Sequence, residues 1–169
     1  MPHRIFRLLT VVWVGSLLTI GYAVAPVLFS SLDRTTAGAV AAQLFRIEGV
    51  LGAVCGILLL GLANVMVRRG GNAYRRLRWF VAGMLICVLV GYFALQPFMN
   101  AMRVAALEAG TDLAHSAYAA RFGMLHGVSS VFYLIESLLG IALVWKLPVD
   151  SGAGAARQGA RDVPGEAAG

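Results

Sequence analysis

Charged side chains are scarce in this sequence. Asp, Glu, Lys and Arg together make up 13% of its 169 residues, whereas hydrophobic residues make up 59%. Soluble domains carry about 25% charged residues, so this balance excludes an ordinary soluble domain. The chain must therefore be solvated mainly by something other than water.

Cysteine and histidine are also rare, with two and three residues respectively. Cys55 and Cys87 each fall in the middle of an apolar run, where a thiol acts as a small packing group rather than as half of a disulfide or metal pair. His3, His115 and His126 share no short ligand spacing, and only His126 is placed to ligate a haem between helices. We expect no metal and no cofactor.

Catalytic sequence motifs are missing as well. The chain contains no nucleophile elbow, no phosphate-binding loop and no glycine motif for dinucleotides. We therefore expect that the protein is not an enzyme.

Four long apolar runs account for the excess of hydrophobic residues. Each has about the twenty residues that cross a hydrocarbon core of roughly 30 Å. They predict an all-α fold, a four-transmembrane-helix bundle with short interfacial helices in the first and third loops. The membrane domain would cover residues 1–149, with spans at about 8–29, 47–67, 79–98 and 125–147, and residues 150–169 would form a disordered cytoplasmic tail.

The basic residues follow the loops between these spans. The net charge is +6, and most of the arginines lie before the first span, in the second loop and after the fourth span. By the positive-inside rule, both termini and the second loop are cytoplasmic. We expect a multi-pass protein of the bacterial inner membrane, with the arginines anchoring it to lipid headgroups and not to nucleic acid.

The fourth span carries the most polar pattern. His126, Ser129, Ser130, Tyr133 and Glu136 fall on one stripe of a helix with 3.6 residues per turn. An ionisable group in hydrocarbon is costly and turns towards other helices, so this stripe should face the interior of the bundle.

The first loop carries an amphipathic pattern, with Asp33 or Thr35 available to cap a short helix that runs into the second span. Glu48 lies in the first turn of that span. Either it pairs with Arg46, Arg34 or Arg121 and is half solvated, or it takes part in binding a ligand or a proton.

The third loop is more polar. Residues 101–120 should form one or two short interfacial helices broken near Gly110 and Thr111, with Thr111 or Asp112 as a cap for the second.

Small residues predict where the spans pack closely. In the first span they recur at helical spacing, and we expect this side to face the bundle: Gly15, Ser16, Thr19, Tyr22 and Pro26. In the second and third spans the corresponding residues are Gly49, Gly52, Gly56, Gly83, Cys87 and Gly91.

Two stretches carry a family resemblance. Residues 25–45 contain Ala25-Pro26-x-x-Phe29 and then Leu32-x-Arg34-x-Thr36-x-Gly38, and Phe122-x-x-x-His126-Gly127-x-Ser129-Ser130 opens the last span. Both resemble the family of small four-span membrane proteins of unknown function that includes the eukaryotic transmembrane protein linked to cisplatin resistance. The resemblance implies a membrane location and a four-span fold, and it implies no reaction. Tyr133 stands where such proteins commonly have asparagine.

Polar residues at the outer ends of the spans suggest one candidate cluster near the non-cytoplasmic mouth of the bundle. It comprises Asp33, Arg34, Glu48, Gln96, Asn100, Arg103, Arg121, His126, Ser129, Ser130, Tyr133 and Glu136. A network that only holds the outer loops in place is one interpretation, and a proton or cation path is the other.

Two function hypotheses follow. In the first, the chain is a non-catalytic structural or accessory protein that binds other membrane proteins, or a second copy of itself, through its glycine faces. In the second, it is a small proton-coupled transporter or permeation unit of the resistance type, using the stripe from His126 to Glu136. Besides other proteins, the expected partner is the lipid bilayer.

Overall fold

Four long antiparallel helical rods make up the structure, a computed structural model that describes residues 2–148. Every regular element in that range is helical. In chain order the elements are α1 (Pro2–Thr19), η1 (Ile20–Val24), α2 (Ala25–Ser31), α3 (Arg34–Arg68), α4 (Asn72–Leu89), η2 (Val90–Leu95), α5 (Gln96–Glu108), η3 (Leu113–His115) and α6 (Ala119–Trp145). The predicted all-α fold with four helices long and apolar enough to cross a membrane is confirmed.

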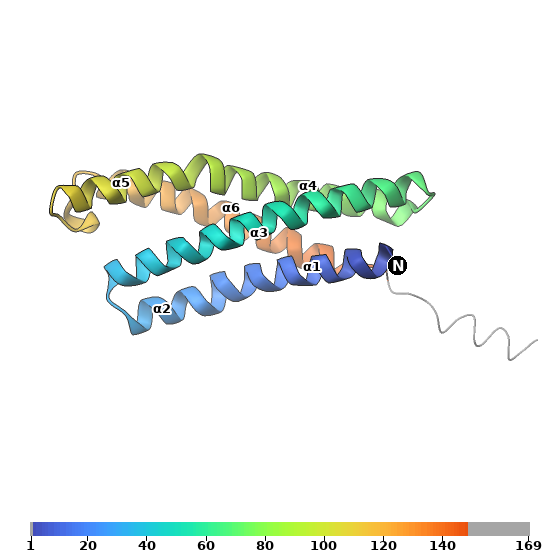
Figure 1. The fold of residues 1–169 in the computed structure, drawn as a ribbon, viewed down its shortest axis with the longest axis horizontal. Coiled ribbons are helices and arrows are strands. Elements are labelled where there is room, and N and C mark those ends of the chain that lie inside the picture. The colour runs from blue at the N-terminus through green and yellow to red at the C-terminus, as the bar shows by residue number, and fades with distance from the viewer. Residues whose placement is uncertain (1, 149–169) are drawn as a thin grey trace, which may run out of the picture.

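The rods pack in a ring in which each touches two neighbours. α1 packs against α3 and α6, and α4 packs against the same two helices. The N-terminus and the turn between α3 and α4 lie at one end of the bundle, which we call the basic end because Arg68 and Arg69 are there (Figure 1). The links from α2 to α3 and from α5 to α6 lie at the opposite end, which we call the mouth.

The helices extend beyond the predicted spans. The first rod runs from Pro2 to Ser31 and the third from Asn72 to Glu108, because α1, η1 and α2, and likewise α4, η2 and α5, follow one another without a break. The helix expected in the first loop is the beginning of α3, so it is continuous with the second span. In the third loop, the predicted break at Gly110 and Thr111 is present, and a single turn of 3-10 helix, η3, follows it. The predicted tail, residues 150–169, lies outside the described part of the chain.

Local hydrogen bonds fix the ends of these elements. The Thr36 backbone N–H donates to the Asp33 carboxylate over 2.9 Å, so Asp33 is the N-cap of α3, one of the two residues predicted for this role. This bond lowers the pKa of Asp33. At the other loop, Asp112 is the N-cap residue of η3, and its side chain makes no capping bond.

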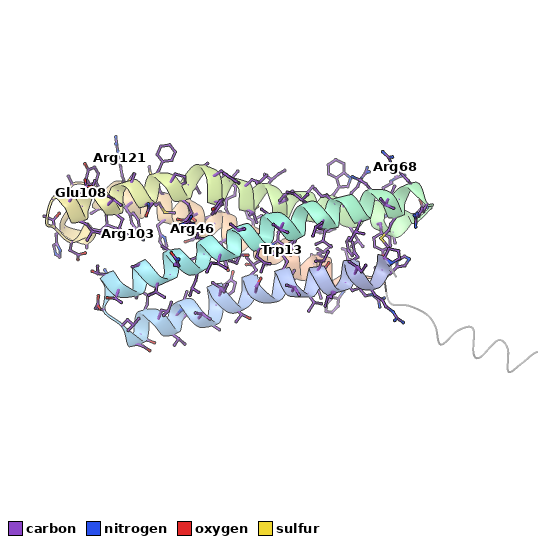
Figure 2. All side chains as sticks on the ribbon, in the orientation of Figure 1. Trp13, Arg46, Arg68, Arg103, Glu108 and Arg121 are labelled. Carbon is purple, nitrogen blue, oxygen red and sulfur yellow. The ribbon has the colours of Figure 1, made fainter. Side chains whose placement is uncertain are left out.

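Close packing in the core depends on glycines of α3. A Cβ atom at Gly52 would lie 2.7 Å from the Trp13 indole nitrogen, and one at Gly56 would lie 2.9 Å from a methyl group of Leu85. Trp13 is fully buried near the middle of the bundle, where Figure 2 shows it between α1 and α3. The predicted close approach at Gly49, Gly52 and Gly56 is confirmed.

The predicted inner face of the first span is wrong within α1, although Tyr22 in η1, which belongs to that predicted face, does bond to Ser137 of α6. Gly15 has no heavy atom near the place where a Cβ would stand, and Thr19 is exposed. The buried residues of this helix are Phe6, Thr10, Trp13, Val14 and Leu17. Large side chains of α1 fill the space that the glycines of α3 leave, so only one of the two helices needs small residues at their interface.

The first and third rods each contain a proline inside the helix, and a π-helical segment ends shortly before that proline in both rods. The Ala25 N–H donates to the Ile20 carbonyl, and the Gln96 N–H donates to the Gly91 carbonyl, each five residues back. Proline follows at once in both cases, at Pro26 and Pro97. A proline ring clashes with the carbonyl four residues earlier in a regular α-helix, and the wider turn accommodates it without ending the rod.

Candidate functional site

A large cavity occupies the mouth half of the bundle. Its volume is about 1280 Å³, and residues from η1, α2, α3, α4, η2, α5 and α6 line it together with residues 110–114. Ligand pockets usually measure about 300–1,000 Å³, so this cavity has room for a small organic molecule. Most of its lining is apolar.

The backbones of two pairs of neighbouring rods are well separated at this level. α2 approaches η1 and α3 but neither α5 nor α6, and no close backbone approach joins α3 to α5. Figure 1 shows α2 and α5 well separated at the mouth, whereas the rods converge near α1 and α4. Because the cavity is lined from both sides of each gap, it extends towards the surface that lipid would cover.

Two carboxyl groups form the floor of the cavity. Glu48 comes from α3 and Glu136 from α6, and each residue is only 4% exposed. They lie close enough to interact electrostatically. One carboxyl oxygen of each, Oε1, is buried without a hydrogen-bond partner. A buried polar atom that is left unsatisfied costs about 1–3 kcal/mol, so this floor favours anything that can satisfy both oxygens.

Trp13 borders this floor. Its indole nitrogen is buried without a hydrogen-bond partner and lies near the Glu136 carboxyl group. Gly52 permits this position, since a Cβ there would collide with the indole nitrogen. Three unsatisfied polar atoms, on Trp13, Glu48 and Glu136, thus belong to one region of the bundle.

Aromatic side chains stand above the carboxyl groups. The rings of Phe45 and Tyr133 meet edge to face with centroids 5.4 Å apart, and Tyr22 lies 6.1 Å from Tyr133. The Tyr133 hydroxyl donates to the Leu17 carbonyl, and the Tyr22 hydroxyl donates to Ser137 over 3.2 Å. These bonds tie α6 to the first rod and keep the aromatic rings on the cavity wall.

The cavity wall carries other titratable groups besides the two glutamates. Besides Tyr22 and Tyr133 they are Arg34 from α3, Cys87 from α4, Tyr92 from η2, Arg103 from α5, Asp112 from the third loop and His126 from α6; Cys55 of α3 lies within electrostatic reach of Glu48. Both cysteines are buried free thiols, as predicted.

The cations of the wall lie nearer the mouth than the carboxyl groups. Arg34 precedes Glu48 by four helical turns, which corresponds to about 21 Å along α3 at 1.5 Å per residue. The Arg103 guanidinium stands 5.8 Å from the centre of the Phe122 ring, and Figure 2 shows Arg103 near Glu108 and Arg121 at the mouth. Neither arginine forms an ion pair with Glu48 or Glu136 among residues 2–148.

The expectation that Glu48 is half solvated and pairs with an arginine is wrong. Glu48 is buried, and its Oε1 atom has no partner. Arg46 is two residues away, which places the two side chains on opposite sides of the helix, and Arg46 is exposed. Arg121 is also exposed and does not line the cavity.

Most of the predicted cluster lines the cavity. The residues of that cluster in the wall are Arg34, Glu48, Gln96, Arg103, His126, Ser129, Ser130, Tyr133 and Glu136, whereas Asp33, Asn100 and Arg121 lie outside it. Within the predicted stripe, Ser130 donates to the His126 carbonyl, and only Glu136 is fully buried. The predicted cluster did not include Trp13, Phe45 and Tyr92, because single aromatic residues in apolar runs carry no distinctive signal in the sequence.

A repeat in the sequence does mark these residues. Residues 38–52 of α3 align without gaps with residues 126–140 of α6. Five pairs of aligned residues are identical: Val40 with Val128, Ile47 with Ile135, Glu48 with Glu136, Leu51 with Leu139, and Gly52 with Gly140. Phe45 corresponds to Tyr133 in this alignment. The first and third rods share a Gly-Tyr pair at the same place in their π-helical segments, Gly21-Tyr22 and Gly91-Tyr92.

The three-dimensional contacts follow the same repeat. Tyr22 bonds to Ser137 of α6, and Tyr92 packs against Gly49 of α3, the position equivalent to Ser137. We call α1 to α3 the N-terminal hairpin and α4 to α6 the C-terminal hairpin. A contact of one hairpin thus has its counterpart in the other, and each hairpin contributes one glutamate to the floor of the cavity.

A family model covers more than half of the chain. The model of DUF4149, a domain of unknown function, matches residues 8–108, from α1 to the last residue of α5. The chain belongs to this family. No curated protein and no solved structure matches it. The matched part of this DUF4149 protein includes Glu48, and the C-terminal hairpin supplies Glu136 beyond it.

Proposed function

We propose that this DUF4149 protein is a multi-pass membrane protein that binds a proton or a small cation between Glu48 and Glu136, as a small proton-coupled transporter or permeation unit. The observation that carries the proposal is the pair of buried carboxyl groups on the floor of one open cavity. Two carboxylates on the floor of one apolar cavity cannot both be charged cheaply, so the pair gains from a proton or a cation that it can release again.

Membrane location and orientation are part of this proposal. We place the chain in a bacterial inner membrane with both termini cytoplasmic, because eight basic residues of the described chain lie at or near the basic end: Arg4, Arg7, Arg68, Arg69, Arg75, Arg76, Arg78 and Lys146. The cavity would then open on the non-cytoplasmic side. A reporter fused after Gly70 should be active only in the cytoplasm, and periplasmic activity would refute this orientation.

The proposal includes no catalysed reaction. It prefers transport to an accessory role because the buried glutamates line a cavity. Of the predicted glycine faces, Gly49, Gly52 and Gly56 pack inside the chain, whereas Gly15 and Gly91 leave open space. The resemblance to the four-span proteins that include the one linked to cisplatin resistance agrees with a membrane role, and this kinship stays a prediction. An accessory role through other surfaces remains the second hypothesis.

Proton flux through the purified protein tests the proposal. Proteoliposomes that contain a pH-sensitive dye should acidify or alkalinise faster than empty vesicles when a proton gradient is imposed. Glu136→Gln should abolish the protein-dependent flux, because glutamine cannot exchange a proton. Glu108→Gln is the matched control, since Glu108 is exposed and lies outside the cavity wall.

Unchanged flux in Glu136→Gln, with normal expression of all variants, would refute the transport role. Loss of expression in Glu136→Gln, combined with no flux in the wild type, would favour the structural role.

A further inference from the structure

We propose that the cavity binds a lipophilic monovalent cation, one molecule at a time, with the positive charge between Glu48 and Glu136 and the apolar body among the aromatic rings above them. This inference rests on the proposed function, since it names the class of solute for the same site. The solute is then an organic cation that dissolves in the membrane, and not a hydrated inorganic ion.

The number of charges follows from the repeat. Each hairpin supplies one glutamate at the equivalent position of the repeat, and both line the floor of the cavity. Within the described chain no arginine, lysine or histidine forms an ion pair with either residue. A pair that keeps one proton carries a single negative charge, so one positive charge balances it and a second would not be balanced.

The wall of the cavity favours an organic cation. Tyr22, Phe45, Tyr92 and Tyr133 present aromatic rings above the carboxyl groups. Aromatic faces attract cations, most strongly where water is excluded, and tyrosine is among the better partners. An inorganic ion would need a shell of oxygen ligands, whereas the described residues around the floor supply chiefly carbon atoms.

Access to the cavity also favours a solute that comes from the bilayer. The wide backbone separations between α2 and α6 and between α3 and α5 lie at the side of the bundle, and large apolar residues of α2 and α5 are exposed, among them Phe29 and Phe98. A cation that entered from water at the mouth would first pass Arg34 and Arg103, which repel it. Entry from the side avoids both arginines.

A pair of ions with the same shape and opposite charge tests the inference directly. Tetraphenylphosphonium and tetraphenylborate are both lipophilic, and their binding to the full-length protein in lipid nanodiscs can be measured by equilibrium dialysis with empty nanodiscs as the blank. We expect saturable binding of about one tetraphenylphosphonium per chain, since one charge has to be balanced. Protein-dependent binding that favours tetraphenylborate would mean that the arginines organise the cavity, and it would overturn the proposal.

Glutamate variants identify the site. Glu48→Gln and Glu136→Gln should each weaken tetraphenylphosphonium binding by about tenfold or more, which corresponds to about 1.4 kcal/mol. Glu108→Gln should leave it within about twofold of the wild type. Equal affinity in all of these proteins would overturn the proposal, and the phosphonium-borate comparison on the wild-type protein remains decisive if either glutamine variant does not fold.

Proton release separates this inference from the proposed function. In weakly buffered solution, binding of tetraphenylphosphonium should release protons from the wild type, with the yield rising as the pH is lowered. Saturable binding without proton release would support the lipophilic-cation site and refute proton coupling. Glu136-dependent proton flux without any tetraphenylphosphonium binding would support the proposed function and overturn the present inference.

Discussion

Phe45 and Tyr133 meet edge to face across the centre of the bundle, with their ring planes at 89°. They come from α3 and α6, two helices that are diagonal in the ring and approach each other only through side chains. Each ring precedes a floor glutamate by three residues, so it lies about one helical turn nearer the mouth than that glutamate. The contact therefore joins equivalent positions of the repeat and lies on the mouth side of the acidic pair.

The contact of Gly52 with Trp13 gives the first stability prediction. Gly52→Ala should destabilise the folded bundle by about 1–3 kcal/mol, because the new methyl group would collide with the indole and with Val88. Thermal unfolding in detergent measures this effect. Gly61→Ala is the matched control: nothing lies near its Cβ position, so better helix propensity should leave stability unchanged or raise it.

Combining Gly52→Ala with Trp13→Phe tests the cause. The smaller ring leaves room for the methyl group, so the two changes together should cost less than the sum of their separate effects. If the stability losses of the two single variants simply add in the double variant, Gly52 is required for a reason other than contact with the Trp13 indole.

The bond from Tyr133 to Leu17 gives a second prediction. Tyr133→Phe should destabilise the bundle by about 1 kcal/mol, because it removes the donor to the Leu17 carbonyl in the rod that contains a π-helical segment. Tyr118→Phe, at a more exposed position, should have no effect. If both variants unfold like the wild type, the hydroxyl group of Tyr133 does not tie α6 to the first rod.

Gly21 gives a related third prediction. A Cβ atom at Gly21 would lie 2.3 Å from the Tyr133 ring, so Gly21→Ala should displace that ring and with it the bond to Leu17. The near-ultraviolet circular dichroism of the aromatic residues should change, whereas Gly15→Ala, which meets open space, should leave the spectrum as it is. An unchanged spectrum in Gly21→Ala would contradict the observed approach.

The cap of α3 gives a prediction about pH. The Thr36 N–H holds the pKa of Asp33 below its ordinary value, so the cap stabilises the helix above the ordinary pKa and loses this contribution as the pH falls through the lowered value. The protection of the amides of residues 34–37, measured relative to the intrinsic exchange rate at each pH, should fall in acid in the wild type. Asp33→Asn keeps an oxygen that can accept the bond but does not titrate, so its exchange should show no such acid step.

Much of the fold could be predicted from the sequence because lipid imposes strict rules on it. Long apolar runs with few charges must be helices, and Asp33 before a helical pattern indicates a cap. Glycines of α3 were informative because their spacing places them on one face. The inner face of α1 was not predictable in the same way, since Trp13 and Leu17 are equally suited to face lipid.

The candidate site could likewise be predicted only in part from the sequence. Glu136 was expected to face the interior because charge avoids lipid, and it does. The partner of Glu48 could not be read from nearby arginines, because Arg46 points the other way and Arg34 is several turns distant. Only the repeat between residues 38–52 and 126–140 indicates that the counterpart of Glu48 is another glutamate.

The links within the two hairpins differ in length. Two residues, Leu32 and Asp33, join α2 to α3, whereas residues 109–118 join α5 to α6 and include η3, and part of this longer link forms a roof over the cavity. A molecule bound at the centre would thus lie between two equivalent glutamates, whereas the two links at the mouth would differ on its two sides. Any difference between inward and outward movement of a solute would therefore arise at the mouth, where the two links differ in length, and not at the two equivalent glutamates.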